Sequence, residues 1–176
     1  MANFQDRVFR AAKLDTRLYE EVEADKGAMG QALGVVILSS VAAGVGTITR
    51  GGFSGILMGT IFAVVGWFLW AYITYLVGTK LLPEPQTKAD LGELLRTIGF
   101  SSSPGLIRVL AIIPGLGWLV FLVASVWMLI AMVIAVRQAL DYKSTLRTIG
   151  VCLIGWILQT ILLALLFSIL GVSKSV

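Results

Sequence analysis

Residues 99–117 read GFSSSPGLIRVLAIIPGLG, and this stretch decides how the chain folds. It combines three serines, two prolines and an arginine with apolar residues. Serine hydroxyls, a proline ring and a guanidinium are all costly in the hydrocarbon core of a membrane. The stretch is therefore a loop outside the membrane, a helix that is broken inside it, or a binding site.

The composition of the whole chain indicates a membrane protein. The chain has 176 residues, of which 57% are hydrophobic and 14% are charged, whereas a soluble domain has about 25% charged residues. Long apolar runs recur along the sequence, which is typical of transmembrane helices. We therefore predict an all-α, polytopic membrane protein of the cell's inner membrane.

The distribution of basic residues indicates whether the segment 97–113 crosses the membrane. A span needs roughly 20 apolar residues, and four segments qualify on length alone: 30–48, 55–82, 118–136 and 146–171. A shorter segment, 97–113, contains Pro104 and Arg108. If it crosses, the basic residues Arg137, Lys143 and Arg147 lie on the same side as the basic N-terminal segment, as the positive-inside rule requires. We predict five transmembrane helices, a cytoplasmic N-terminus, a non-cytoplasmic C-terminus and a third span kinked by Pro104.

The sequence divides into three parts. Residues 1–28 form a cytoplasmic amphipathic N-terminal segment, residues 29–172 form the five-span membrane domain, and residues 173–176 form a short tail. The apolar face of the N-terminal segment consists of Phe4, Val8, Ala11, Leu18 and Val22. Asp15 interrupts this face, so a second helix can begin at Thr16. The segment either lies on the membrane surface or docks a partner protein.

Two further sets of residues suggest contacts. Gly51, Gly55 and Gly59 share one helix face, which is typical of close helix packing, either inside the bundle or between copies of the chain. Arg137, Lys143 and Arg147 form a basic edge, which either only sets the topology or contacts anionic lipid. Arg137 and Asp141 are placed to form an ion pair.

Arg108 has two possible surroundings. It either extends outward to lipid phosphates or faces the bundle, where it bonds carbonyls, a bound lipid, or polar groups such as Gln138 and Gln159. The serines before it can bond the carbonyls that Pro104 leaves without a partner.

The motifs of enzymes are missing from the sequence. There is no histidine, and Cys152 is the single cysteine. The patterns HExxH, GxGxxG after a strand, P-loop and CxxC do not occur. We therefore expect no catalytic, cofactor-binding or metal-binding residues, no cofactor and no nucleic-acid partner.

The run Gly99, Phe100, Ser101, Ser102, Ser103, Pro104 resembles the G-[YF]-S-x-x-P element of the YIP family, the Ypt/Rab-interacting polytopic membrane proteins. Residues 18–36, LYEEVEADKGAMGQALGVV, are similar to the opening of the bacterial branch of that family. The resemblance implies five spans and an outward C-terminus, and in eukaryotic members it implies roles in vesicle budding and GTPase recruitment. Eukaryotic members carry a D-L-Y-G-P element before the first span. Its absence from this chain argues against a Rab-type GTPase as a direct partner.

Together these observations predict a non-enzymatic integral membrane scaffold or accessory protein. We expect it to act through helix–helix contacts with itself or with other membrane subunits, in a larger complex or in membrane organisation, and to contact lipids. The candidate interaction residues are Gly99, Phe100, Ser101, Ser103, Pro104 and Arg108. The alternative is a lipid-handling protein or small-molecule transporter that uses the kinked third span.

Overall fold

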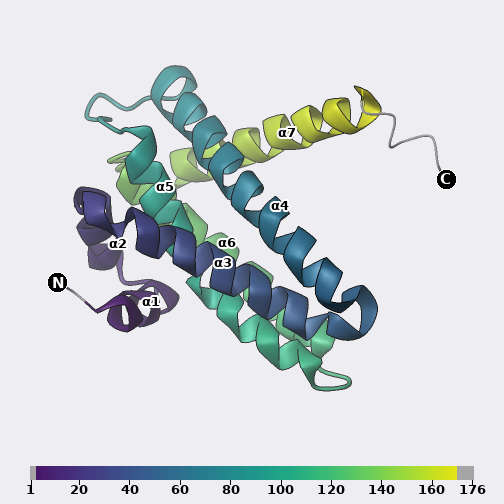
Figure 1. Ribbon diagram of the computed structural model, residues 1–176. Coiled ribbons are helices and arrows are strands. Elements are labelled where there is room, and N and C mark those ends of the chain that lie inside the picture. The colour runs from purple at the N-terminus through teal and green to yellow at the C-terminus, as the bar shows by residue number, and fades with distance from the viewer. Residues whose placement is uncertain (1–2, 170–176) are drawn as a thin grey trace.

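The computed structural model describes residues 3–169, and every regular element within them is a helix (Figure 1). The predicted all-α class is therefore confirmed. The predicted tail at residues 173–176 and the end of the last predicted span lie outside the described residues.

The N-terminal segment consists of two short helices, α1 (Phe4–Ala12) and α2 (Thr16–Ala24). The Asn3 side chain caps α1 by accepting a hydrogen bond from the backbone amide of Gln5 at 3.4 Å. Asp15 caps α2 by accepting from the amide of Arg17 at 3.1 Å. The polar residue that interrupts the predicted apolar face is thus the cap that starts the second helix. A short 3₁₀ helix, η1 (Lys26–Ala28), leads into the membrane domain.

Four helices are long and apolar enough to cross a membrane, judged by length and composition over residues 3–169. The corresponding stretches are Lys26–Gly46, Gly52–Leu81, Gly117–Ala139 and Thr145–Leu165. They contain α3 (Met29–Gly46), α4 (Ile48–Leu76) with its π-helical extension η2 (Val77–Leu81), α6 (Gly117–Ala139) and most of α7 (Thr145–Ile169). These four agree with the four segments that the sequence predicts on length alone.

The third predicted span, 97–113, falls in two helices of different type, α5 (Leu91–Phe100) and the 3₁₀ helix η3 (Ser103–Ile112). Asp90 and Glu93 form a capping box at the start of α5, with hydrogen bonds of 2.8 and 2.7 Å. Pro104 lies at the start of η3, where the missing amide of a proline costs least. The sequence predicts one kinked helix, whereas the chain changes helix type at the serines.

The pair α5–η3 runs beside α3 in the same direction. Near the start of both, a Cβ atom added at Gly92 would lie 3.8 Å from the Cε atom of Met29. Further along, Gly99 faces Ala32 and Gly105 faces Ser39, and at the far end Gly46 of α3 faces the Arg108 carbonyl and Ala111. The ribbon in Figure 1 shows the two segments side by side over this length.

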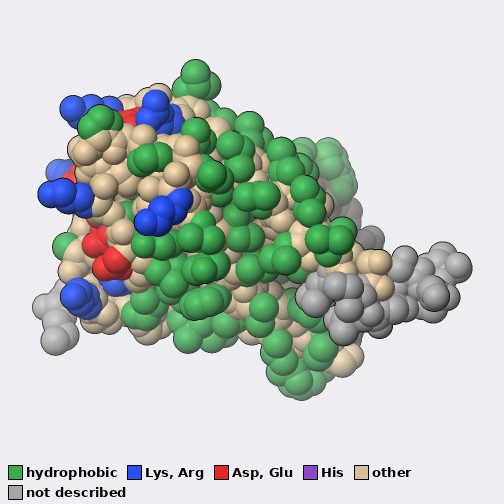
Figure 2. All heavy atoms as spheres, turned by 90° about the horizontal axis from the view of Figure 1, so that it is seen from above, with side chains coloured by type: hydrophobic (Ala, Val, Ile, Leu, Met, Phe, Trp, Pro, Cys, Tyr) green, Lys and Arg blue, Asp and Glu red, His purple; other side chains and the backbone are tan. Residues whose placement is uncertain are grey.

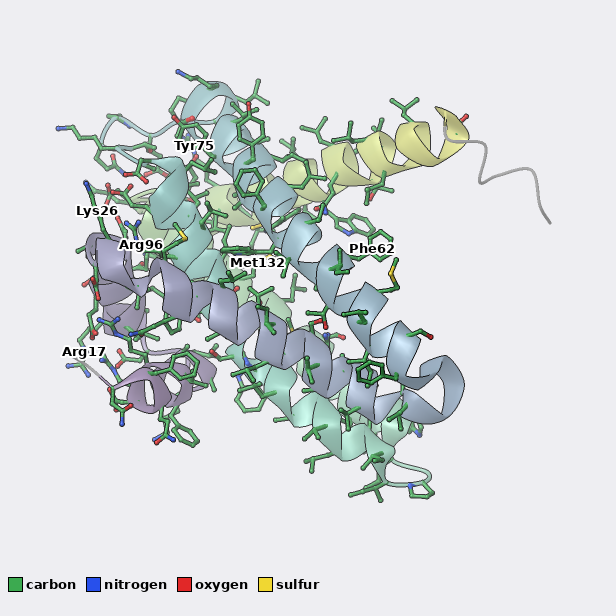
Figure 3. The ribbon with its side chains drawn as sticks, viewed as in Figure 1. Arg17, Lys26, Phe62, Tyr75, Arg96 and Met132 are labelled. Atoms are coloured by element: carbon green, nitrogen blue, oxygen red, sulfur yellow. The ribbon has the colours of Figure 1, made fainter. Side chains whose placement is uncertain are left out.

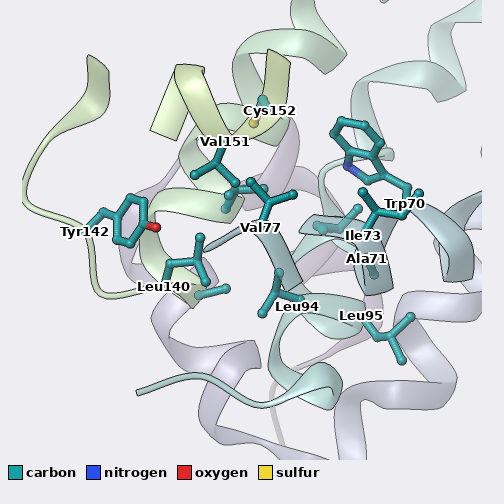
Figure 4. Packing of buried hydrophobic residues seen from close by; sticks show 13 residues of the cluster. Trp70, Ala71, Ile73, Val77, Leu94, Leu95, Leu140, Tyr142, Val151 and Cys152 are labelled. Carbon is teal, nitrogen blue, oxygen red and sulfur yellow. The ribbon is translucent and has the colours of Figure 1, made fainter. Parts of the chain in front are cut away.

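Two clusters of buried apolar residues hold the bundle together. One joins α4 and η2 to α5, α6 and α7, and Figure 4 shows it around Trp70, Val77, Leu94 and Leu140. The other packs α1 and α2 onto α3, α5 and α6. Figure 2 shows the charged side chains gathered at one end of the face in view and apolar side chains over most of the remainder. We call the charged end, made of residues 3–28, 82–90 and 137–147, the polar end.

We expect Gly99→Ala to lower the melting temperature of the protein in detergent, because the new Cβ would lie 2.7 Å from the Ala32 Cβ atom. Such overpacking costs about 1–3 kcal/mol. Gly30→Ala is the matched control, since a Cβ at that helical glycine would meet nothing within 4 Å. Equal melting temperatures for the two variants would show that α3 and α5 are not in this contact.

Candidate functional site

An open cavity of about 410 Å³, lined by polar and apolar side chains, lies among the apolar helices of the bundle. Residues from α3, α4, α5, η3, α6 and α7 line it, together with the turn between α5 and η3. Its polar lining, besides Arg108 and two tryptophans, consists of Ser39, Ser40, Ser101, Ser102, Ser125 and Gln159. In the view of Figure 3, Met132 of α6, which also lines the cavity, lies away from Arg17 and Lys26 at the polar end.

The serine–proline run forms one wall of this cavity. The hydroxyls of Ser101 and Ser103 donate to the carbonyls of Ile98 and Phe100, each at 2.7 Å. These bonds satisfy carbonyl groups where the α-helix ends, as the sequence predicts. Ser103 and Pro104 are buried, and Phe100 is fully buried in the cluster beneath α1 and α2. Of the run from Gly99 to Pro104, Ser101 and Ser102 line the cavity.

Arg108 lies at the edge of the same cavity. Its Nη2 atom donates to the Ser125 hydroxyl at 3.4 Å, and its guanidinium carbon lies 5.5 Å from the centre of the Phe121 ring. Its Nε atom is buried and makes no hydrogen bond to a described residue. Of the two glutamines that the sequence offers as neighbours, Gln159 lines this cavity, whereas Gln138 donates to Glu20 at the polar end. The guanidinium therefore lies against α6 at the cavity edge.

The glycine stripe makes no contact inside the described chain at the two positions that can be assessed. Gly55 and Gly59 are exposed on α4, and a Cβ atom at either would meet nothing within 4 Å. The surroundings of Gly51 lie outside the described residues. The close helix contacts come instead from Gly44, Gly46, Gly99 and Gly105. The packing role predicted for the stripe stays a prediction that concerns contacts between chains.

The predicted basic edge comes together in the turn between α6 and α7. Arg137 donates to the carbonyls of Tyr142 and Lys143, at 3.1 and 3.2 Å. Arg147 donates to the Pro83 carbonyl at 2.9 Å and lies 3.8 Å from Glu84. The guanidinium of Arg137 therefore bonds these carbonyls, and the ion pair suggested with Asp141 is not among its contacts within residues 3–169. Arg137 therefore fixes the turn between α6 and α7, and Arg147 joins α7 to the loop at residues 82–90.

The contacts that fix the N-terminal helices are not among those predicted from the sequence. Arg7 is buried and bonds Glu21 at 2.9 Å, Asp25 at 2.8 Å and Gln31 at 3.1 Å. It thereby ties α1 to α2 and α3. One signal was present, since Arg7 stands at helical spacing within the apolar stripe of Phe4, Val8 and Ala11.

A second buried arginine fixes α2 to the bundle. Arg96 of α5 donates to the carbonyls of Val22, at 2.8 Å, and Glu23, near the last turn of α2. A cation there also favours the negative end of the helix dipole. Trp127 of α6 donates to the Ala12 carbonyl at 2.8 Å. The N-terminal helices are thus docked on their own chain through named polar contacts.

An acidic cavity of about 440 Å³ lies where α2 meets the rest of the polar end. Burial is the largest cause that raises the pKa of Glu23, to about 7, and the carboxylates of Asp141, Glu93 and Glu20 add to it. Arg96 acts in the opposite direction. The proton on Glu23 therefore stabilises the docked position of α2.

We expect the docking of α1 and α2 to weaken as the pH rises from about 4.5 toward 7. The docked state holds the Glu23 proton over this range and the undocked state does not, so acid favours docking. Hydrogen exchange of residues 4–24, corrected for intrinsic rates, should be faster at a pH of about 8 than at about 6. Glu23→Gln should remove this difference, and a variant with the full pH dependence would contradict the assignment.

Comparison with known proteins agrees with this architecture. A model of the Yip1 domain matches residues 17–167, from the first turn of α2 almost to the end of α7. A search of the curated proteins and of the solved structures finds no significant match. The resemblance carried by residues 99–104 is thereby confirmed at the level of the family, and the assignment to its bacterial branch stays a prediction. With apolar helices long enough to cross a membrane over most of the matched region, this chain belongs to the Yip1 family of multi-pass membrane proteins.

Proposed function

We propose that this protein is a non-enzymatic scaffold of the bacterial inner membrane, which acts through helix–helix contacts with a second copy or with another membrane subunit. The observation that carries the proposal is the outward position of Gly55 and Gly59 on α4, a helix that buries little of its length within the chain. Small residues on an exposed membrane helix allow another backbone to approach closely.

A five-span topology underlies this proposal. Ten residues of α-helix in α5 extend about 15 Å, and ten residues of 3₁₀ helix in η3 extend about 20 Å. Their sum of about 35 Å exceeds the roughly 30 Å of the hydrocarbon core. The pair also runs parallel to α3 along its length, so a crossing by α3 implies a crossing by α5–η3 in the same direction. The basic turn after α6 then returns to the cytoplasmic side, together with the N-terminus.

We expect Lys88→Cys and Leu116→Cys, each in a Cys152→Ala background, to react with an impermeant maleimide from opposite sides of the membrane. Both positions are exposed, and they flank α5–η3. Lys88→Cys should be labelled only from the cytoplasmic side in inverted vesicles, and Leu116→Cys only in intact spheroplasts. Labelling of both from one side would show that the segment does not cross.

We expect the wild-type protein, extracted from native membranes in a mild detergent, to migrate as a complex larger than the monomer. Gly59→Leu should reduce this complex, because a bulky side chain prevents close approach of another helix. Leu57→Ala is the control on the opposite face of α4, where Leu57 is exposed, and it should leave the complex intact. A monomeric wild-type protein without a co-purifying protein would overturn the scaffold proposal.

A second candidate function is lipid handling by α5–η3. The observation that favours it is the open cavity beside Arg108, with its polar side chains among otherwise apolar helices. The two functions differ in the surface that they use, since the cavity lining includes neither Gly55 nor Gly59.

A further inference from the structure

The cavity beside Arg108 carries one positive charge and no negative charge. Arg108 is the only ionisable residue among those that line it, and none of these described residues is acidic. A guanidinium stays protonated in proteins, so the charge cannot be removed by loss of a proton. An uncompensated cation inside the membrane is costly and marks a site where a counter-charge is expected.

The Arg108 guanidinium makes one hydrogen bond to the described chain. Its Nη2 atom donates to the Ser125 hydroxyl at 3.4 Å, and its Nε atom is buried and makes no hydrogen bond to a described residue. Ser125 lines the same cavity, and a serine hydroxyl can donate as well as accept. The cavity thus presents a fixed cation beside a hydroxyl donor, which together suit an oxyanion.

The remaining lining suits the apolar part of an amphiphile. Met128, Leu129 and Met132 of α6 line the cavity beside its polar groups. Leu129 and Ser125 are exposed on the outside of the chain, so the cavity opens on a face that is otherwise apolar. In a membrane this face meets acyl chains, which allows a headgroup to enter sideways while its tails stay in the bilayer.

We propose that this cavity binds the phosphate group of a single phospholipid, with Arg108 as the counter-charge and the neighbouring Ser125 hydroxyl as a hydrogen-bond donor. A free phosphate ion offers the same oxygens but lacks the acyl chains that the apolar opening accommodates. The site is independent of the scaffold role, because a monomer that has lost its helix–helix contacts retains every residue of the cavity.

The test uses the full-length protein in detergent, titrated with short-chain phosphatidylglycerol and followed by native mass spectrometry and thermal unfolding. We expect one lipid to bind the wild-type protein and to raise its melting temperature. Arg108→Gln should bind roughly tenfold more weakly, since a charge-assisted bond is lost. Without lipid, Arg108→Gln should melt at the same temperature as the wild type or higher, because it removes an uncompensated charge.

Three further variants make the outcome decisive. Arg108→Lys should retain part of the affinity, and Ser125→Ala should lose part of it, because the hydroxyl donor is removed. Ser125→Ala also tests the site if Arg108→Gln does not fold, since Ser125 is exposed. Arg17→Gln is the control, because the Arg17 side chain is 85% exposed on α2, at the polar end, and it should bind like the wild type.

Separate arms distinguish the source of the phosphate. Inorganic phosphate and glycerol phosphate, at the concentration that saturates with lipid, should neither bind nor displace the lipid. Displacement by either would assign the site to a soluble phosphate and overturn the lipid assignment. Unchanged lipid binding by both Arg108→Gln and Ser125→Ala would overturn the site itself. A monomeric protein that still binds lipid would refute the scaffold and leave this site standing.

Discussion

The close approach of α5–η3 to α3 is the contact on which the rest of the structure depends. It is possible because Gly99 and Gly105 present no side chain to Ala32 and Ser39. Backbones that meet this closely gain van der Waals contact, which is the main source of helix association where water is absent. The contact fixes the direction of α5–η3, turns Phe100 into the cluster beneath the N-terminal helices, and places Arg108 at the cavity edge. Both the docking of α1 and α2 and the shape of the cavity follow from it.

The change of helix type at the serines follows from the need to satisfy every buried backbone group. Pro104 has no amide to donate, so a carbonyl before it loses its helical partner. Ser101 and Ser103 donate to the carbonyls of Ile98 and Phe100, and the chain continues as a 3₁₀ helix, which is unusually long at ten residues. The larger rise per residue of this helix makes α5–η3 long enough for the crossing that we propose. The serines that appear costly in the sequence are therefore the groups that make the broken segment tolerable.

Local patterns were predictable from the sequence, and contacts between distant segments were not. Apolar runs determine α3, α4, α6 and α7, so the positions of these four helices could be predicted directly from the sequence. The outward position of Gly55 and Gly59 could not, because a stripe of small residues does not say which neighbour it meets. The partners of Arg7 lie 14 to 24 residues away, and the cavity collects residues from across the chain. Beyond Ser101, Ser102 and Arg108, which lie in the stretch 99–117, its polar lining therefore has no local signature in the sequence.

The arginines of the bundle show why the two ends of the molecule differ in role. Arg7 bonds two carboxylates and an amide, and Arg96 bonds two carbonyls. In both cases these bonds offset the free energy that burial of the guanidinium costs. Arg108 has only the Ser125 hydroxyl and the face of Phe121, and neither carries a charge that offsets its own. A half-buried ion that the chain leaves uncompensated lowers the stability of the folded protein. The phosphate that we propose in the cavity offsets this cost, so Arg108 contributes to the affinity for the ligand rather than to the stability of the empty bundle.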